Sequence, residues 1–288
     1  MNLGEPMKIT TYNLRFANER DVHPWSERRP LMIDLIAGSA PTILGTQEGL
    51  RFQLDEIEAG LPPWYAWVGE GRSLGEQNEY CAVFYDQRRL EVLDVTQRWF
   101  STTPEVPGSC SWGSCPRIMT AVSFRERSTG EELLVINTHL DHMSVYARRF
   151  SADYLATYVQ ANAKGRPTIV MGDFNTAARV SAVYRRLSET PLVDSFEAPV
   201  TGSSAEDWDR PTFNNYLPPP RSGHRIDWIL VSPEVQVQSS VVNTSSFDGL
   251  YASDHLPVEA VVRLNRALQP VGASSAVPRV SSARAAGA

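Results

Sequence analysis

The stretch INTHLDH, at residues 136–142, changes abruptly from an apolar pattern to a run of polar and titratable side chains. The residues from 132 to 137 have the character of a β-strand, and beyond Ser144 the apolar spacing becomes that of a helix. A strand that simply ends in the core needs none of Asn137, His139 or Asp141. Layered α/β proteins commonly build sites where strands end, because the sheet fixes the geometry while the loop stays accessible. This joint therefore predicts a functional site.

Other strand ends have the same polar character. The polar residues at these ends are Asn13, Glu48, Asn137 with His139 and Asp141, Asp173 with Asn175, Asp227, and Asp254 with His255. Any one of them has a structural explanation, since Asn and Asp favour turns and a single His is commonly structural. Taken together, their carboxylate and amide oxygens are ligands suited to Mg²⁺ or Mn²⁺. Two imidazoles beside them can position a water and neutralise developing charge, as phosphoryl transfer requires.

The apolar patterns predict an α/β protein. We expect helices at residues 27–37, 51–59, 144–164 and 179–188, and strands at 8–14, 42–46, 80–85, 90–100, 119–125, 132–137, 166–175, 224–232 and 256–264. Neighbouring strands in the middle of the chain are close enough for antiparallel hairpins. The pattern predicts two packed sheets flanked by helices. The Pro-rich residues 201–223 are expected to form a long surface loop.

Composition favours one folded catalytic domain over residues 1–266, followed by a tail at 267–288 that is rich in Ala, Ser, Pro and Gly and is expected to be disordered. The net charge of −6 argues against binding long nucleic acid through charge alone. No stretch approaches the roughly 18 apolar residues that cross a bilayer, and the N-terminus lacks a signal-peptide pattern. Three cysteines are too few for a disulfide framework, so we expect reduced thiols, with a Cys110 to Cys115 loop disulfide as the alternative. These features favour a cytoplasmic protein, and we expect a monomer.

Seven motifs together resemble the endonuclease/exonuclease/phosphatase superfamily, in that family's order. They are TYNLR at 11–15, TQE at 46–48, NEYCAVFY at 78–85, NTHLDH at 137–142, GDFN at 172–175, RIDWIL at 225–230 and SDHLPV at 253–258. The resemblance covers about residues 7–264. It implies a four-layer α/β/β/α sandwich of two mainly antiparallel sheets and Mg²⁺-dependent hydrolysis of phosphoesters.

The resemblance also implies roles for ten residues. Glu48 resembles the principal metal ligand, with Asn13 beside it and Asp254 as a further ligand. Asp173 resembles the residue that orients or deprotonates the attacking water. Asn175 resembles a phosphate or water contact, and Asp227 resembles the carboxylate that holds His255. His139 resembles the second catalytic imidazole, with Glu79 as its carboxylate partner. Arg117 and His139 resemble residues that contact the phosphate.

The sequence leaves several alternatives open. We expect a phosphodiester substrate of nucleic-acid, nucleotide or phospholipid type but not general duplex DNA. A phosphomonoesterase of inositol-phosphate type and a silent module that binds a phosphorylated ligand are the alternatives. Asp141 and His142 fit a turn cap as well as a substrate contact. An aromatic platform for a base or sugar and ordinary packing in the core or a loop are the alternatives for four tryptophans, Trp25, Trp64, Trp112 and Trp208. His224 has no assigned role.

Overall fold

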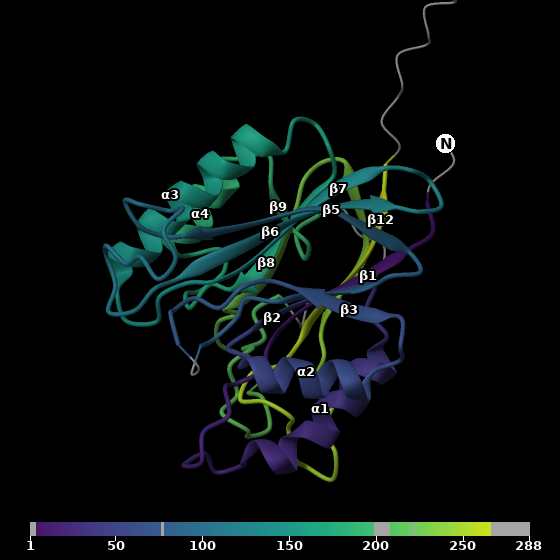
Figure 1. The fold of residues 1–288 in the computed structure, drawn as a ribbon, viewed down its shortest axis with the longest axis vertical. Coiled ribbons are helices and arrows are strands. Elements are labelled where there is room, and N and C mark those ends of the chain that lie inside the picture. Colours follow the sequence, from purple (N-terminus) through teal and green to yellow (C-terminus); the bar gives the residue numbers. More distant parts are fainter. Residues whose placement is uncertain (1–3, 76–77, 199–207, 221, 266–288) are drawn as a thin grey trace, which may run out of the picture.

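A computed structural model of the chain describes residues 4–75, 78–198, 208–220 and 222–265. Two six-stranded sheets pack face to face, and a pair of helices covers the outer face of each sheet, which makes four layers (Figure 1). The predicted α/β/β/α sandwich is therefore confirmed. The predicted tail at 267–288 and part of the predicted loop at 201–223 lie outside the described residues.

Each sheet has one parallel strand pair at its centre, and all its other pairs are antiparallel. The first sheet has the order β11-β12-β1-β2-β4-β3 and consists of β1 (Met7–Asn13), β2 (Ile43–Gln47), β3 (Tyr65–Val68), β4 (Val83–Asp86), β11 (Val235–Val242) and β12 (Val258–Leu264). The second has the order β5-β6-β7-β8-β10-β9 and consists of β5 (Leu90–Trp99), β6 (Ile118–Glu126), β7 (Glu132–His139), β8 (Thr168–Asp173), β9 (Val193–Asp194) and β10 (Asp227–Val231). The parallel pairs are β1 with β2 and β7 with β8.

Two helices pack on each sheet. The helices are α1 (Trp25–Ser39) and α2 (Arg51–Gly60) on the first sheet, and α3 (Val145–Asn162) and α4 (Ala182–Ser188) on the second. One apolar cluster fills the space between the sheets. A second lies between the first sheet and its helices, and a third lies between the second sheet and its helices. Ser144 caps α3 as the sequence predicts, because its Oγ accepts a hydrogen bond from the backbone N–H of Ala147 at 3.1 Å.

The sequence patterns miss three strands, β3, β9 and β11. β3 and β9 have only four and two residues, too few for a periodic signal. β11 contains several polar residues and a register shift between Val237 and Ser239, which breaks its alternation. The helix expected at 179–188 begins at Ala182 instead, because the Ser181 side chain caps it by accepting a hydrogen bond from Tyr184 N.

The described part of the predicted surface loop is less exposed than expected. Residues 208–220 and 222–223 contain no helix or strand, but Thr212 and Asn214 are buried. Phe213 forms an isolated β-bridge with His255. This loop therefore packs against the edge of the sandwich that holds one of the predicted site residues. No helix in the described ranges is long and apolar enough to span a membrane.

A buried amide joins the two sheets at the centre of the sandwich. Asn137 on β7 donates from its Nδ2 to the carbonyl oxygens of Thr46 and Ala82, both at 2.8 Å. Its Oδ1 accepts from Gln47 Nε2 at 2.7 Å. Gly45 leaves room for this amide, because a Cβ there would lie 2.9 Å from the Asn137 side chain. Asn137 therefore ties the second sheet to the backbone of the first.

We predict that Asn137→Ala lowers the free energy of unfolding by about 2–4 kcal/mol, since it removes three buried hydrogen bonds and leaves their partners without them. Urea unfolding followed by circular dichroism measures this change. Asn162→Ala is the matched control, because this half-buried amide makes one hydrogen bond at the end of α3 and should cost less than 1 kcal/mol. A similar loss in both variants would show that Asn137 has no special role between the sheets.

Candidate active site

All ten predicted site residues lie at one edge of the sandwich. The carboxyl ends of β1, β2, β7 and β8 meet there with the amino ends of the antiparallel strands β4, β6, β10 and β12. A cavity of about 340 Å³, called here the site pocket, opens at this edge. Eight of the ten line it, namely Glu48, Glu79, Arg117, His139, Asp173, Asn175, Asp254 and His255. Asn13 and Asp227 are fully buried and contact the lining residues.

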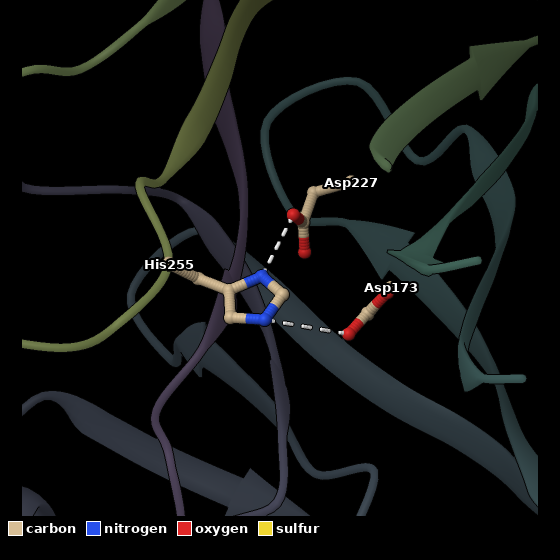
Figure 2. Close-up of side chains that lie close together, drawn as sticks. All are labelled: Asp173, Asp227 and His255. Atoms are coloured by element: carbon tan, nitrogen blue, oxygen red, sulfur yellow. Dashed lines mark hydrogen bonds and ion pairs between the residues drawn. The ribbon is translucent and has the colours of Figure 1, made fainter. Parts of the chain in front are cut away.

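Two carboxylates hold His255 in place (Figure 2). Its Nδ1 lies 2.9 Å from Asp227 Oδ2, the contact that the sequence predicts, and its Nε2 lies 3.8 Å from Asp173 Oδ2. Asp227 begins β10 and Asp173 ends β8, and the two residues are paired in register, so the sheet itself sets their separation. The His255 ring is therefore oriented by groups whose backbone positions are fixed.

His139 has different neighbours from those expected. Its Nε2 lies 2.9 Å from Asn175 Nδ2 and 3.6 Å from Asp173 Oδ2. Glu79 was expected to be its carboxylate partner, but the Glu79 carboxylate pairs with Arg72 at 2.6 Å. This expectation was wrong because Arg72, which no motif singled out, faces Glu79 across an isolated β-bridge between Gly71 and Tyr80.

The two imidazoles have opposite pKa shifts. Burial alone lowers the pKa of His255, but the negative charges of Asp227 and Asp173 outweigh it and raise the pKa. Burial also lowers the pKa of His139, and the positive charges of Arg117 and Arg72 lower it further. The carboxylate partner that the resemblance implies for His139 would raise its pKa, and the shift in the structure is in the opposite direction. At neutral pH one ring is charged and the other is neutral, an arrangement that separates acid and base roles.

Asp173 is the carboxylate at the centre of the site. Its Oδ2 accepts from Asn13 Nδ2 at 3.0 Å, and its Oδ1 accepts from the backbone N–H of Asn175 at 2.8 Å. Burial raises its pKa, and the nearby charge of Asp227 raises it further. A carboxylate that is held rigidly and has a raised pKa is suited to accept a proton from water.

Glu48 lies beside Asn13 at the end of β2. Glu48 Oε1 accepts from Asn13 Nδ2 at 3.1 Å, and Oε2 accepts from the backbone N–H of Phe16 at 3.2 Å. Glu48 has a φ of 65°, and two other lining residues, Arg15 and Asn175, have φ values of 56° and 49°. Non-glycine residues rarely adopt this left-handed conformation, and they concentrate at functional sites.

The donor set fits a hard divalent cation. Asp173, Asp227 and His255 offer ligand atoms that lie within 4.8 Å of one another. Asp227 Oδ1 is buried and has no hydrogen-bond partner among the described residues, and burial raises the pKa of Asp254. The Asn13 amide turns its nitrogen toward Glu48 and Asp173, while its oxygen accepts from Arg15 N. Carboxylate oxygens are thus the ligands at hand for a metal.

Arg117 supplies positive charge to the site pocket. Its side chain is 6% exposed, and its Nε and Nη1 have no hydrogen-bond partner among the described residues. Its Nη2 lies 2.8 Å from Nδ1 of His142. His142 therefore has a contact inside the site, while Asp141 caps the turn by accepting from the backbone N–H groups of Met143 and Ser144.

Sequence reasoning assigned no role to two further arginines in the site pocket, Arg15 and Arg72. Arg15 belongs to the TYNLR motif, so its position offered a signal, whereas nothing near Arg72 in the sequence did. Of the four tryptophans considered for an aromatic platform, Trp25 lies near the pocket, where it lines a neighbouring cleft. Trp112 stacks on Phe150, Trp64 lies under Arg88, Trp208 packs on the core between the sheets, and His224 lines a separate cavity.

The chain belongs to the endonuclease/exonuclease/phosphatase family, whose model matches residues 10–255. Members of this family are metal-dependent hydrolases of phosphoester bonds. An uncharacterised protein of Acanthamoeba polyphaga mimivirus, L388, is 28% identical over 169 residues, which are 54% of this chain and 60% of that protein. The match thus spans less than two thirds of this curated relative.

Several solved structures are similar over nearly their whole length. The endonuclease/exonuclease/phosphatase of Bacteroides vulgatus is 30% identical with a TM-score of 0.82, and the alignment covers 91% of this chain and 100% of that one. The mannosyl-6-phosphatase Bt3783 of Bacteroides thetaiotaomicron is 32% identical with a TM-score of 0.80, covering 89% and 99%. TDP2 from D. rerio, at 16% identity and a TM-score of 0.71 over 90% and 99%, shares the fold.

We predict that Asp227 acts chiefly through His255. His255→Ala should lower kcat by roughly two to four orders of magnitude, the scale of a positioned acid or base. Adding Asp227→Asn to this variant should then lower kcat little further, because the effects of substituting two coupled catalytic groups do not add. Steady-state kinetics of the wild type, both single variants and the double variant measure the coupling.

Asp153→Asn is the control for this cycle, since Asp153 forms an exposed ion pair with Arg186 far from the pocket. It should change kcat by less than twofold, alone or with His255→Ala. Fully additive losses for Asp227 and His255 would mean that Asp227 acts independently, and an active His255→Ala protein would remove His255 from the mechanism.

Proposed function

We propose that the chain is a divalent-metal-dependent phosphatase that removes the terminal phosphate from a small phosphomonoester, with a hexose phosphate as the first candidate. The observation that carries this proposal is the charge of the site pocket. Three arginines and His255 line a cavity of about 340 Å³ beside four carboxylates. Nε and Nη1 of Arg117 are buried and have no hydrogen-bond partner among the described residues, and the nearest carboxylate oxygen to Nε is Asp141 Oδ2 at 4.0 Å. A terminal phosphate carries more negative charge than a diester and would use these donors.

The sequence comparison supports the same substrate class. The mannosyl-6-phosphatase of Bacteroides thetaiotaomicron is 32% identical and aligns over 99% of its length. The sequence analysis favoured a phosphodiester, and the pocket's charge is the reason to place a monoester ahead of it. A silent binding module stays the alternative from another class.

In this mechanism, Asp173 accepts a proton from the attacking water while Asn13 and the backbone of Asn175 keep the carboxylate oriented. The water oxygen forms a bond to phosphorus as the ester P–O bond breaks, and the leaving sugar oxygen takes up a proton from solvent water, while Asp173 later returns its proton to solvent. His255 stays protonated against Asp227 and stabilises charge on the phosphate oxygens. His139 stays neutral, oriented by Asn175, and therefore contributes a hydrogen-bonding group without charge. Arg117 binds a phosphate oxygen.

Glu48 and Asp254 would hold the metal. Mg²⁺ suits these carboxylate oxygens best, with Mn²⁺ as the alternative. A bound divalent cation supplies charge neutralisation at the phosphate. We also propose a cytoplasmic monomer. The three cysteines carry free thiols, which suits a reducing compartment.

A panel of substrates tests the proposed function directly. We expect release of phosphate from mannose 6-phosphate and p-nitrophenyl phosphate with Mg²⁺ or Mn²⁺, slower cleavage of bis-(p-nitrophenyl) phosphate, and no activity in EDTA. Preference for the diester would restore the phosphodiesterase interpretation. Phosphate binding without turnover of any substrate would favour the silent binding module.

We predict that Glu48→Gln raises the Mg²⁺ concentration needed for half-maximal activity at least tenfold and lowers kcat, because an amide is a weaker ligand than a carboxylate. Metal titrations of activity measure both quantities, and thermal melting checks that the fold is intact. Glu91→Gln is the control, since Glu91 forms an exposed ion pair with Arg125. Near-normal Mg²⁺ activation of Glu48→Gln would remove Glu48 from the metal site.

A further inference from the structure

A second cavity continues outward from the site pocket. This outer cleft has a volume of about 770 Å³ and lies between residues 16–26 and the first turn of α2. Phe16 and Glu79 line both cavities, so the two spaces share a wall. None of the residues assigned to catalysis or metal binding lines the outer cleft apart from Glu79.

Hydrogen bonds from α2 fix the walls of the outer cleft. Gln53, which is fully buried, accepts from the backbone N–H of Ala17 at 2.8 Å and donates to the Arg15 carbonyl oxygen at 3.3 Å. Farther along the same segment, Trp25 Nε1 donates to Glu56 of α2 at 2.7 Å. The cleft is therefore held in shape before any ligand enters, which lowers the entropic cost of binding.

The outer cleft has fewer cations than the site pocket. Three arginines, Arg15, Arg72 and Arg117, line the site pocket beside four carboxylates. Among the described residues that line the outer cleft, Arg20 is the one Arg or Lys, and it is accompanied by the acids Glu19 and Glu79. A nucleic-acid strand needs a cation near each phosphate, so this cleft is poorly suited to a polyanion. Whatever it binds should be neutral.

The lining of the outer cleft combines aromatic faces with polar groups. Phe52 is 47% exposed and lines the cleft together with Phe16, while Asn18 and Ser26 contribute an amide and a hydroxyl. An acyl chain would meet too many charged and polar groups here. A sugar ring has an apolar face of C–H groups and an edge of hydroxyls, which matches both kinds of lining.

The size of the outer cleft indicates more than one ring. The site pocket, at about 340 Å³, is near the lower limit for ligand pockets, so it offers room for a phosphate and the group that carries it and little more. The outer cleft, at about 770 Å³, adds room beyond that group. We propose that the outer cleft is a subsite for a neutral sugar unit, so that the substrate is an oligosaccharide whose terminal hexose carries the phosphate. This inference rests on the proposed function.

Substrate length provides the test. We compare a hexose 6-phosphate with a disaccharide that carries the phosphate on C6 of its terminal hexose, and thymidine 5′-monophosphate serves as a nucleoside probe. The disaccharide should have a kcat/KM roughly tenfold higher than the hexose phosphate, the scale of one aromatic contact. The gain should arise mainly in KM, because the added contact is made before and during the reaction alike.

Phe52→Ala should bring the ratio of the two kcat/KM values to within twofold of one. Phe150→Ala is the matched control, since Phe150 is 43% exposed on α3 and lies outside the lining of the cleft, and this variant should keep the tenfold ratio. Ser26→Trp, which fills the cleft, should also remove the advantage. Thermal melting of each variant identifies any loss of folding, and two independent substitutions keep the test decisive if one of them fails to fold.

A binding measurement separates this inference from the proposed function. Saturation-transfer NMR should detect the unphosphorylated disaccharide on the wild type and not on Phe52→Ala, whether or not the protein hydrolyses phosphate. Hydrolysis of the hexose phosphate without any advantage for the disaccharide would overturn the sugar subsite and leave the phosphatase standing. A preference for thymidine monophosphate in the wild type that disappears in Phe52→Ala would overturn the sugar subsite and indicate a nucleoside subsite instead.

Discussion

The contact of Asn137 with the first sheet is the interaction on which the site depends. Its amide joins β7 to the backbone of Thr46 and to Gln47, both at the end of β2. Glu48 follows Gln47 directly, and His139 follows Asn137 by two residues. One buried hydrogen-bond cluster therefore sets the distance between the sheet that carries the proposed metal ligand Glu48 and the sheet that carries His139 and Asp173.

Electrostatics then divides this edge of the sandwich into regions. Buried carboxylates surround His255 and keep it protonated, while arginines near His139 keep it neutral. Burial raises the pKa of Glu79 to about 7, and the neighbouring Arg72 opposes this shift. The site pocket thus brings three arginines together with four carboxylates, whereas the described lining of the outer cleft has one arginine and two acids. The two cavities are matched to different parts of one molecule, a charged end and an uncharged remainder.

The sequence determined the fold class and most of the site. Apolar runs that end in polar residues revealed nine of the twelve strands, because a strand buried on both faces leaves a strong local signal. The same pattern placed Asn13, Glu48, Asp173 and His255 at one edge, since consecutive strand ends of a layered sheet protein meet there. The Asp227 contact to His255 followed from the motifs as well.

Tertiary structure decided the partners and the charges. The Glu79 carboxylate pairs with Arg72 across a local β-bridge, and Asn175 lies beside His139 in the place expected for Glu79. Strand pairing decides both contacts, because β7 and β8 are neighbours in one sheet and bring His139 and Asn175 together. The pKa of His139 falls through burial and nearby arginines, neither of which has a local sequence signal. The sequence by itself thus determined which chemical groups gather at the edge, and packing alone decided which group faces which, because burial and pairing depend on contacts between distant segments.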